Sequence, residues 1–468
     1  MNRVAIFLAS VVLAATVLVA VKVQLTVREP YMDEIFHVDQ IEKFCDGNFT
    51  YWNRKISTPP GLYLFTLPFV YASRLFANLG PMSCSLPSLR FYNLAWLLVL
   101  YALCYQYRVE LYIERRKILP GLEALVCVLM PILYFSSFLY YTDLLSNITV
   151  IAMYLQNRHR CIGRSVFLSI GAVLMRQTNI VWVAFCAGLS LTDSLQLEFQ
   201  LLAKRNQDFR PDDCRTISGL ARSSVDLWQQ FKTPDIVSFT YRSVKPIIGY
   251  LFVFLLFFIF IIANRGLAFG DHSAHKPVPH VPQVLYCVTL IFGLSHVHFL
   301  NLETFHAFLQ FLRRNIPTCL VLVCTCLISV HFFTYEHEYL LADNRHYTFY
   351  IWRKIFKRHF TVPYLATLVY IPSLWCVAHG LSKKSQIWCL GYIICVALVV
   401  VPNRLLEFRY FITPYLLWRL NMSASLVTYR SVGLEILLLV VVNVVTLYLF
   451  VFHSFEWTHE PGTQRFMW

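Results

Sequence analysis

The stretch EPYMDEIFHVDQIEKFCDGNFTYWNRKISTPPGLY, from Glu29 to Tyr63, decides how the chain is arranged around a membrane. It is rich in charged and turn-forming residues, and it begins soon after an apolar run at residues 4–23. That run has the roughly 20 residues of a membrane span and lacks the small-residue cleavage site of a removed signal peptide. The sequence therefore predicts a retained first span that is followed by a polar loop.

The composition points to a membrane protein. Of the 468 residues, 57% are hydrophobic and only 14% are charged, whereas a soluble domain has roughly 25% charged residues. The formal net charge of +14 comes from short basic clusters between apolar segments. This is the pattern that the positive-inside rule gives to cytoplasmic loops, and it argues against nucleic acid as a partner. We therefore expect an all-α polytopic membrane protein.

Further apolar segments continue to the C-terminal end of the chain, and they predict about 11–14 transmembrane helices. Several segments are shorter than the roughly 17 residues that a full span needs, so some helices are expected to be broken or re-entrant. The sequence shows no separate soluble domain and no internal repeat. We expect residues 1–468 to form one membrane domain.

The basic clusters predict the orientation of the spans. We assign the segments 108–117, 158–164, 204–222 and 313–314 to the cytoplasm because each is rich in Lys or Arg. This assignment requires residues 28–88 to remain on the lumenal side as one large loop. The apolar, proline-containing part of that loop, residues 61–79, is then expected to be a helix at the membrane interface. Residues 193–246 become a long cytoplasmic loop.

Two features of the lumenal loop depend on its compartment. The triplet Asn48-Phe49-Thr50 is an N-glycosylation acceptor only on the lumenal side. Cys45 and Cys84 lie in polar segments of this loop, unlike most of the 14 cysteines. They would pair in an oxidising lumen, or they would remain free thiols, and the sequence leaves both alternatives open. No cysteine or histidine spacing fits a metal site, so we expect neither a metal nor another cofactor.

Asp33 and Glu34 are adjacent carboxylates at the start of the loop, flanked by Tyr31 and His37. A single ionisable residue at a membrane boundary is often simply solvated among the headgroups. Two together beside aromatic residues are expected to be partly buried, and burial would raise the pKa of a carboxylate that acts as a general base. We predict that one of them is such a base.

Several cationic residues fall on the same side of the predicted topology. Arg176 interrupts two apolar runs, and a buried arginine needs an anionic partner. Arg345, His346 and Arg409 add positive charge, and arginine matches phosphate well. Alternatively, two local ion pairs form within the loops, Arg345 with Asp343 and Arg409 with Glu407.

A base and several cations outside a membrane suit an enzyme that takes a sugar from a lipid phosphate. The base would accept a proton from the acceptor hydroxyl, and the cations would stabilise the departing phosphate. Direct displacement at the anomeric carbon inverts its configuration. A transporter with polar cavity residues would give a similar profile.

Six blocks resemble, closely and in order, the endoplasmic reticulum family of dolichyl-phosphate-glucose-dependent α-1,2-glucosyltransferases. They are EPYMDEIFH, PPGLYL, MRQTNI, YLLADNRHYTFYIWR, LLEFRYF and QRFMW. The resemblance implies the GT-C glycosyltransferase architecture and a lumenal active site. It implies transfer of the third, terminal α-1,2-linked glucose from dolichyl phosphate glucose to the diglucosylated dolichyl-diphosphate oligosaccharide.

The resemblance also implies roles for individual residues. It makes Asp33 the base, with Glu34 as rival or assistant, and it places the amphipathic helix of the loop after Pro59-Pro60-Gly61. Other residues of the matching blocks are expected to contact the substrates: Tyr31, His37, Asp343, Asn344 and Glu407. Membrane lipid and other glycan-assembly enzymes are the expected partners. Another dolichyl-phosphate-sugar transferase and a polytopic transporter or channel modulator are the competing interpretations.

Overall fold

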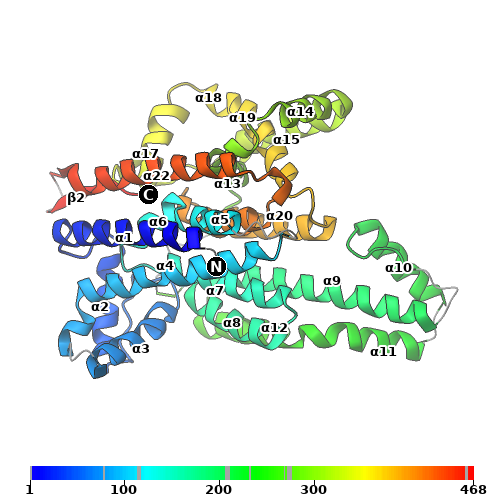
Figure 1. The fold of residues 1–468 in the computed structure, drawn as a ribbon, viewed down its shortest axis with the longest axis horizontal. Helices are drawn as coiled ribbons and strands as arrows, with labels where there is room; N and C mark the ends of the chain where they lie inside the picture. The colour runs from blue at the N-terminus through cyan, green and yellow to red at the C-terminus, as the bar shows by residue number, and fades with distance from the viewer. Residues whose placement is uncertain are drawn as a thin grey trace.

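The computed structural model describes residues 3–76, 80–112, 118–205, 211–230, 233–267, 269–270, 277–458 and 462–468. Most of this chain is helical, and long helices such as α1 and α22 follow the long axis of the molecule (Figure 1). The helices, in chain order, are α1 (Arg3–Thr26), α2 (Glu34–Cys45), α3 (Gly61–Phe76), η1 (Gly80–Cys84), α4 (Leu86–Val109), α5 (Leu119–Val128), α6 (Pro131–Ser136), α7 (Asp143–Arg158), α8 (Ile162–Met175), η2 (Gln177–Asn179), α9 (Ile180–Arg205), α10 (Ile217–Gln230), α11 (Thr233–Val244), η3 (Lys245–Ile247), α12 (Ile248–Asn264), α13 (Pro282–Ser295), η5 (His296–His298), α14 (Leu302–Arg314), α15 (Ile316–Phe333), α16 (Glu338–Ala342), α17 (Tyr347–Ile351), η6 (Trp352–Phe356), α18 (Val362–Leu365), α19 (Thr367–Gly380), α20 (Gln386–Val400), η7 (Phe408–Phe411), α21 (Ile412–Asn421), η8 (Ala424–Leu426) and α22 (Tyr429–Phe452).

Seven helical stretches in the described chain are long and apolar enough to cross a membrane. They are Ala9–Thr26, Leu86–Val109, Gln177–Arg205, Ile236–Asn264, Ile316–Phe333, Val362–Gly380 and Tyr429–Phe452. Three shorter apolar helices accompany them: Leu119–Val128, Ile162–Met175 and Gln386–Val400. The predicted all-α polytopic class is therefore confirmed. The count of 11–14 spans and the GT-C architecture stay predictions.

The loop after the first span folds into α2 and α3, which lie together at one end of the molecule (Figure 1). Helix α3 begins at Gly61, directly after Pro59-Pro60, and the Pro60 carbonyl accepts the amides of Tyr63 and Leu64 in its first turn. Proline suits this position because its missing N–H is not needed at the start of a helix. Gly61 packs so closely on the backbone of Leu174 that a Cβ atom would overlap its carbonyl group. The Pro-Pro-Gly sequence thus starts the helix and seats it against the end of α8.

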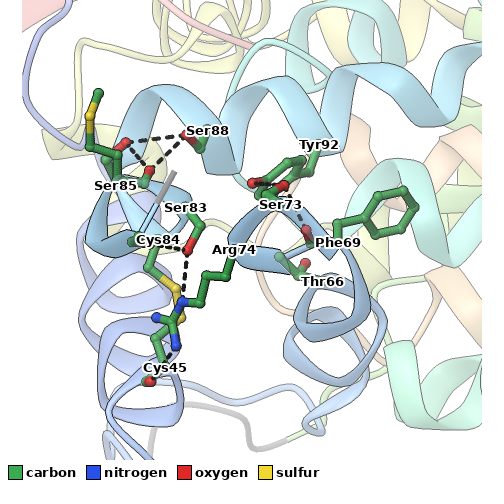
Figure 2. The surroundings of a disulfide bond; sticks show 12 residues. Cys45, Thr66, Phe69, Ser73, Arg74, Ser83, Cys84, Ser85, Ser88 and Tyr92 are labelled. Atoms are coloured by element: carbon green, nitrogen blue, oxygen red, sulfur yellow. Dashed lines mark hydrogen bonds between the residues drawn. A yellow bond between two sulfur atoms is a disulfide. The ribbon is translucent and has the colours of Figure 1, made fainter. Parts of the chain in front are cut away.

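A disulfide joins Cys45 at the end of α2 to Cys84 at the end of η1, with 6.6 Å between the Cα atoms. Figure 2 shows the side chain of Arg74 beside this bond. Arg74, from α3, donates hydrogen bonds to the Cys45 carbonyl at 3.3 Å and to the Ser83 hydroxyl at 2.9 Å. Of the two alternatives for these cysteines, the structure therefore has the pair, which fastens α2, α3 and the start of α4 together.

The segment 193–246 is mostly helical. Helix α9 continues to Arg205, and α10 and α11 follow it at the end of the molecule opposite α2 and α3 (Figure 1). An ion pair of 2.7 Å between Glu198 and Arg242 holds α11 against α9. The sequence did not predict these helices, and the assignment of the segment to a cytoplasmic loop stays a prediction.

A buried ionic network joins five helical elements away from the polar loops. Arg419 of α21 contacts Glu435 of α22 at 2.8 Å and Glu123 of α5 at 3.0 Å. Arg108 of α4 pairs with the same Glu123, and His298 lies 2.8 Å from Glu435. Arg108 is fully buried in this network, which the sequence did not predict, while the cytoplasmic assignment of its basic cluster stays a prediction. The residues 113–117 of that cluster lie outside the described chain.

The C-terminal tail adds a small antiparallel sheet that the sequence did not predict. Strand β1 (Ser454–Glu456) pairs with β2 (Thr463–Arg465), directly after α22. Figure 1 shows this sheet at the same end of the molecule as α2 and α3. The tail therefore lies close to the polar loops that carry the predicted site.

Candidate active site

Asp33 stands immediately before the first residue of α2, where its carboxyl group meets a residue from the far end of the chain. Nη2 of Arg409, in η7, donates to Oδ2 of Asp33 at 3.0 Å. The Asp33 side chain remains 47% exposed, so it is accessible while it is ion-paired. The backbone carbonyl of Asp33 meanwhile accepts the first hydrogen bonds of α2.

Partial burial is the largest single effect on the pKa of Asp33 and would raise it. The charge and hydrogen bond of Arg409, together with the nearby His37 and His346, outweigh burial and hold the pKa below its ordinary value. The sequence-based expectation of a raised pKa is therefore wrong for Asp33. The physical reason is the neighbouring guanidinium, whose charge favours the ionised carboxylate. Asp33 is thus ionised at neutral pH, which is the state that a general base requires.

Arg409 is shared between three acidic residues. It pairs with Glu407, it reaches Asp33, and its Nη1 lies 3.8 Å from the Asp143 carboxylate. The guanidinium also stands over the ring of Tyr141, 5.5 Å from the ring centre. The predicted alternative of a local Arg409–Glu407 pair is therefore present, but Arg409 also connects that pair to Asp33.

Asp143 opens α7 and extends this arrangement to Arg176, which follows α8. Nη2 of Arg176 donates to Asp143 at 2.9 Å, and its Nε donates to the Thr142 hydroxyl at 3.3 Å. Asp143 is fully buried, whereas the Arg176 side chain is 18% exposed. Within the described chain, Nη1 of Arg176 has no hydrogen-bond partner and remains available to a ligand.

Glu34 has surroundings quite unlike those of Asp33. Its carboxylate is fully buried and forms a two-pronged ion pair with Arg90 of α4, with Nε to Oε1 at 2.8 Å. It also accepts the backbone amides of Tyr31 at 3.1 Å and Tyr140 at 2.7 Å. With both oxygens enclosed by donors, Glu34 fastens the start of α2 to α4 and to the segment before α7.

His37 lies one turn into α2 and faces the same interior as Glu34. Its Nδ1 is 2.7 Å from the hydroxyl of Tyr63. Burial lowers the pKa of His37 to about 4, although the nearby Asp33 charge opposes this shift. His37 is therefore neutral at physiological pH and adds no positive charge to the site.

Asp343, Asn344, Arg345 and His346 form a second group of polar residues. The guanidinium of Arg345 forms two hydrogen bonds of 2.8 Å to the Asp343 carboxylate, so the predicted local pair is present here as well. Asn344 accepts a 2.8 Å hydrogen bond from the Trp457 indole, and His346 contacts the Trp468 carbonyl at 3.0 Å. This group is thus tied to the C-terminal tail.

Tyr31 connects the polar residues around Asp33 with the C-terminal tail that holds the group around Arg345. Its buried hydroxyl donates to the Arg465 carbonyl and accepts from the Arg465 amide, both at 2.8 Å. Burial raises the pKa of Tyr31 to about 12, so the hydroxyl stays protonated. The described residues contain no cluster of three or more His, Cys, Asp or Glu side chains suited to a metal ion.

A comparison with known protein families identifies the family of this chain. The sequence profile of the DIE2/ALG10 family matches residues 27–420, which is most of the chain. The chain belongs to the DIE2/ALG10 family. The matched region contains Asp33, Asp143, Arg176, Arg345 and Arg409, so it covers the cationic and acidic residues of both polar groups. The resemblance inferred from the six sequence blocks is therefore confirmed.

Curated relatives in this family match nearly the whole length of the chain. A protein of Rattus norvegicus is 35% identical over 455 residues, which cover 94% of each chain. A protein of Arabidopsis thaliana is 35% identical over 493 residues, covering 94% of this chain and 95% of its own. Both bear the name Dol-P-Glc:Glc(2)Man(9)GlcNAc(2)-PP-Dol alpha-1,2-glucosyltransferase. No solved structure matches the chain.

Two residues of the candidate site were not predicted from the sequence. Arg90 lies at the start of an apolar segment, where a charge signals a buried partner, but the sequence does not show that this partner is Glu34. Nothing in the local sequence shows that Asp143 contacts both Arg176 and Arg409. The ion-pair partners of Arg90 and Asp143 lie in segments that are distant in the chain.

Proposed function

We propose that this protein transfers the terminal α-1,2-linked glucose from dolichyl phosphate glucose to the diglucosylated dolichyl-diphosphate oligosaccharide. The observation that carries this proposal is the 35% identity, over 94% of the chain, to proteins named for this reaction. The accessible carboxylate of Asp33 at the membrane boundary supports it, because the reaction needs a base there. The reaction makes the protein an inverting hexosyltransferase.

In the proposed reaction, Asp33 accepts the proton of the acceptor hydroxyl as its oxygen attacks the anomeric carbon of glucose. The bond from that carbon to the phosphate oxygen breaks, and dolichyl phosphate leaves with the electron pair. Attack opposite to the leaving group inverts the anomeric configuration. Arg409 keeps Asp33 ionised before the reaction, and Glu34 acts as a positioning residue because its oxygens are fully engaged.

The departing phosphate requires cations, and we assign this role to Arg176, Arg345 and His346. Arg176 supports the assignment best, since its Nη1 is open to a ligand within the described chain and its side chain is partly exposed. Arg409 fits the phosphate role less well because three acidic residues already surround it. We therefore reassign Arg409 from phosphate binding to control of Asp33.

We place the active site on the lumenal side of the endoplasmic reticulum membrane. The Cys45–Cys84 disulfide supports this location, because disulfides persist in oxidising compartments. The exposed acceptor triplet at Asn48, in the same loop, is consistent with it. Tyr31, His37, Asp343, Asn344 and Glu407 shape the walls in which the substrates bind, and other glycan-assembly enzymes are proposed neighbours in the membrane.

The deciding experiment is a transfer assay with purified protein in detergent and EDTA. It supplies dolichyl phosphate glucose and the diglucosylated lipid-linked acceptor, and it compares wild type with Asp33→Asn. Wild type should add one α-1,2-linked glucose, and the variant should lose nearly all transfer because a neutral amide cannot accept the proton. Transfer by the variant would support the proposed function but would show that Asp33 is not the base.

A folded wild type without transfer, even with metal ions restored and other dolichyl-phosphate sugars supplied, would contradict the proposed function. Transfer of another sugar would indicate the competing transferase. No transfer of any sugar would favour the transporter or channel modulator.

A further inference from the structure

The last residues of the chain, Gly462–Trp468, run beside the polar group around Arg345. The amide of Met467 donates to the Arg345 carbonyl at 2.9 Å, and the amide of Tyr347 donates to the Met467 carbonyl at 3.2 Å. These bonds make a parallel β-bridge between Met467 and His346. Met467 is only 2% exposed, so the tail is seated in the protein and does not lie loosely on it.

Side chains reinforce the backbone pairing. Oε1 of Gln464 accepts a 3.1 Å hydrogen bond from Nη1 of Arg345. The Trp468 carbonyl accepts a 3.0 Å hydrogen bond from Nδ1 of His346, and the Trp468 ring packs edge-on against Tyr347 with 5.0 Å between ring centres. Both residues that we assign to the donor phosphate in this loop are therefore held by the tail.

The tail also holds the start of the catalytic loop. Tyr31 lies only two residues before Asp33, and its hydroxyl makes two 2.8 Å hydrogen bonds to the backbone of Arg465. The Arg465 guanidinium in turn donates to the carbonyls of Phe450 and Val451, at the end of α22. The tail thus spans from α22 to the Tyr31 segment and to the loop at Arg345.

We propose that the tail Gly462–Trp468 is a positioning element of the active site, which sets the place of Arg345 and His346 relative to Asp33. It follows that the C-terminus lies on the same side of the membrane as Asp33, and that α22 crosses towards that side. The positioning role rests on the proposed function, whereas the sidedness does not. A small misplacement of catalytic groups is costly in rate, so a fixed tail matters even though it need not touch substrate.

The sidedness is tested in sealed microsomes. The full chain is extended after Trp468 by a flexible Gly-Ser spacer that ends in an Asn-Gly-Thr acceptor triplet. We expect the added triplet to be glycosylated, as shown by a mobility shift that endoglycosidase removes. Asn48→Gln in the same protein separates this signal from glycosylation at the natural triplet.

A second readout leaves the C-terminus unextended. Thr463→Cys, at an exposed position of the tail, should react with a membrane-impermeant maleimide only after the microsomes are permeabilised, with wild-type labelling as background. An unglycosylated extension together with labelling of intact vesicles would overturn the proposal. Neither readout needs glucose transfer, so a failure of the proposed function can be distinguished from a failure of the proposed sidedness.

The positioning role is tested by Tyr31→Phe and Gln464→Leu, which each remove a contact to the tail without removing a charge. Both should lower kcat on the order of 10- to 100-fold while the KM for the acceptor stays unchanged. Gln464→Glu keeps an acceptor for Arg345 and should restore most of kcat, and Glu456→Gln, on the exposed strand β1, should have no effect. Unchanged kcat in folded Tyr31→Phe and Gln464→Leu would overturn the positioning role.

Discussion

Arg409 donates a hydrogen bond of 3.0 Å to Asp33, although 376 positions separate the two residues. The contact brings the segment before α21 against the first turn of α2. It leaves the Asp33 carboxylate accessible and favours its ionised form, because Arg409 makes the largest contribution to lowering its pKa and opposes the effect of burial. The protonation state of the proposed base is therefore set by a residue from the other end of the chain.

Replacing Arg409 should change the pH dependence of transfer. In wild type, Asp33 has a lowered pKa and stays ionised until the pH falls below its ordinary value, so activity persists into acid. In Arg409→Gln, burial is no longer opposed by this charge, and the pKa of Asp33 rises. The acid limb of kcat/KM should then move to higher pH, which is measured by transfer assays across a pH series.

The control for this prediction is Arg345→Gln, because Arg345 pairs with Asp343 and makes no contact with the Asp33 carboxylate in the described chain. This variant should lower kcat/KM at every pH without moving the acid limb. An acid limb that stays in place in Arg409→Gln would show that Arg409 does not control the base.

The adjacent carboxylates show how far sequence reasoning reaches. The charge pattern predicts a polar loop after the first span, a base at the start of this loop and a helix after Pro59-Pro60. The structure has that helix as α3, whereas α2 was not predicted. It could not separate Asp33 from Glu34. Consecutive residues at a helix start point about 100° apart, so one faces the interior and the other the surface, and tertiary packing decides which.

The partners of the arginines were equally out of reach. Hydropathy and charge count show that Arg108 belongs to a basic cluster, but they do not show that its side chain is buried against Glu123. The local pairs of Arg345 and Arg409 were foreseeable because their acidic partners lie two positions away in sequence. Asp143 and Arg90 were not foreseeable because their partners lie on other helices.

Glu34→Gln should cost stability more than chemistry. The substitution leaves the charge of Arg90 buried without its counter-ion, and breaking a buried ion pair costs about 3–5 kcal/mol. The thermal midpoint in detergent should fall clearly, while Asp33→Asn should leave it nearly unchanged. Glu42→Gln, at an exposed position on the same helix, is the matched control and should alter neither property. A stable Glu34→Gln protein without transfer would instead make Glu34 the base.

The disulfide should contribute to the stability of the catalytic loop. Cys45 and Cys84 close a loop with a sequence separation of 39, and such a crosslink typically contributes about 2–4 kcal/mol. Cys84→Ser should therefore lower the thermal midpoint, and reduction of wild type should lower it similarly. Cys324→Ser, which changes an exposed free cysteine, should leave the midpoint in place. Equal midpoints for wild type and Cys84→Ser would show that the bond does not form in the membrane-bound protein.

Arg176 should affect use of the lipid donor. A hydrogen bond to a charged group is worth about 1.5–3 kcal/mol, so Arg176→Gln should raise the KM for dolichyl phosphate glucose by roughly 10- to 100-fold and leave the acceptor KM unchanged. Because Arg176 also neutralises the buried Asp143, a second variant is needed to separate an effect on donor binding from an effect on folding. Arg176→Gln with Asp143→Asn removes both charges and should regain stability without regaining donor affinity. Recovery of the donor KM in that double variant would assign Arg176 a structural role, since its charge would then serve only Asp143.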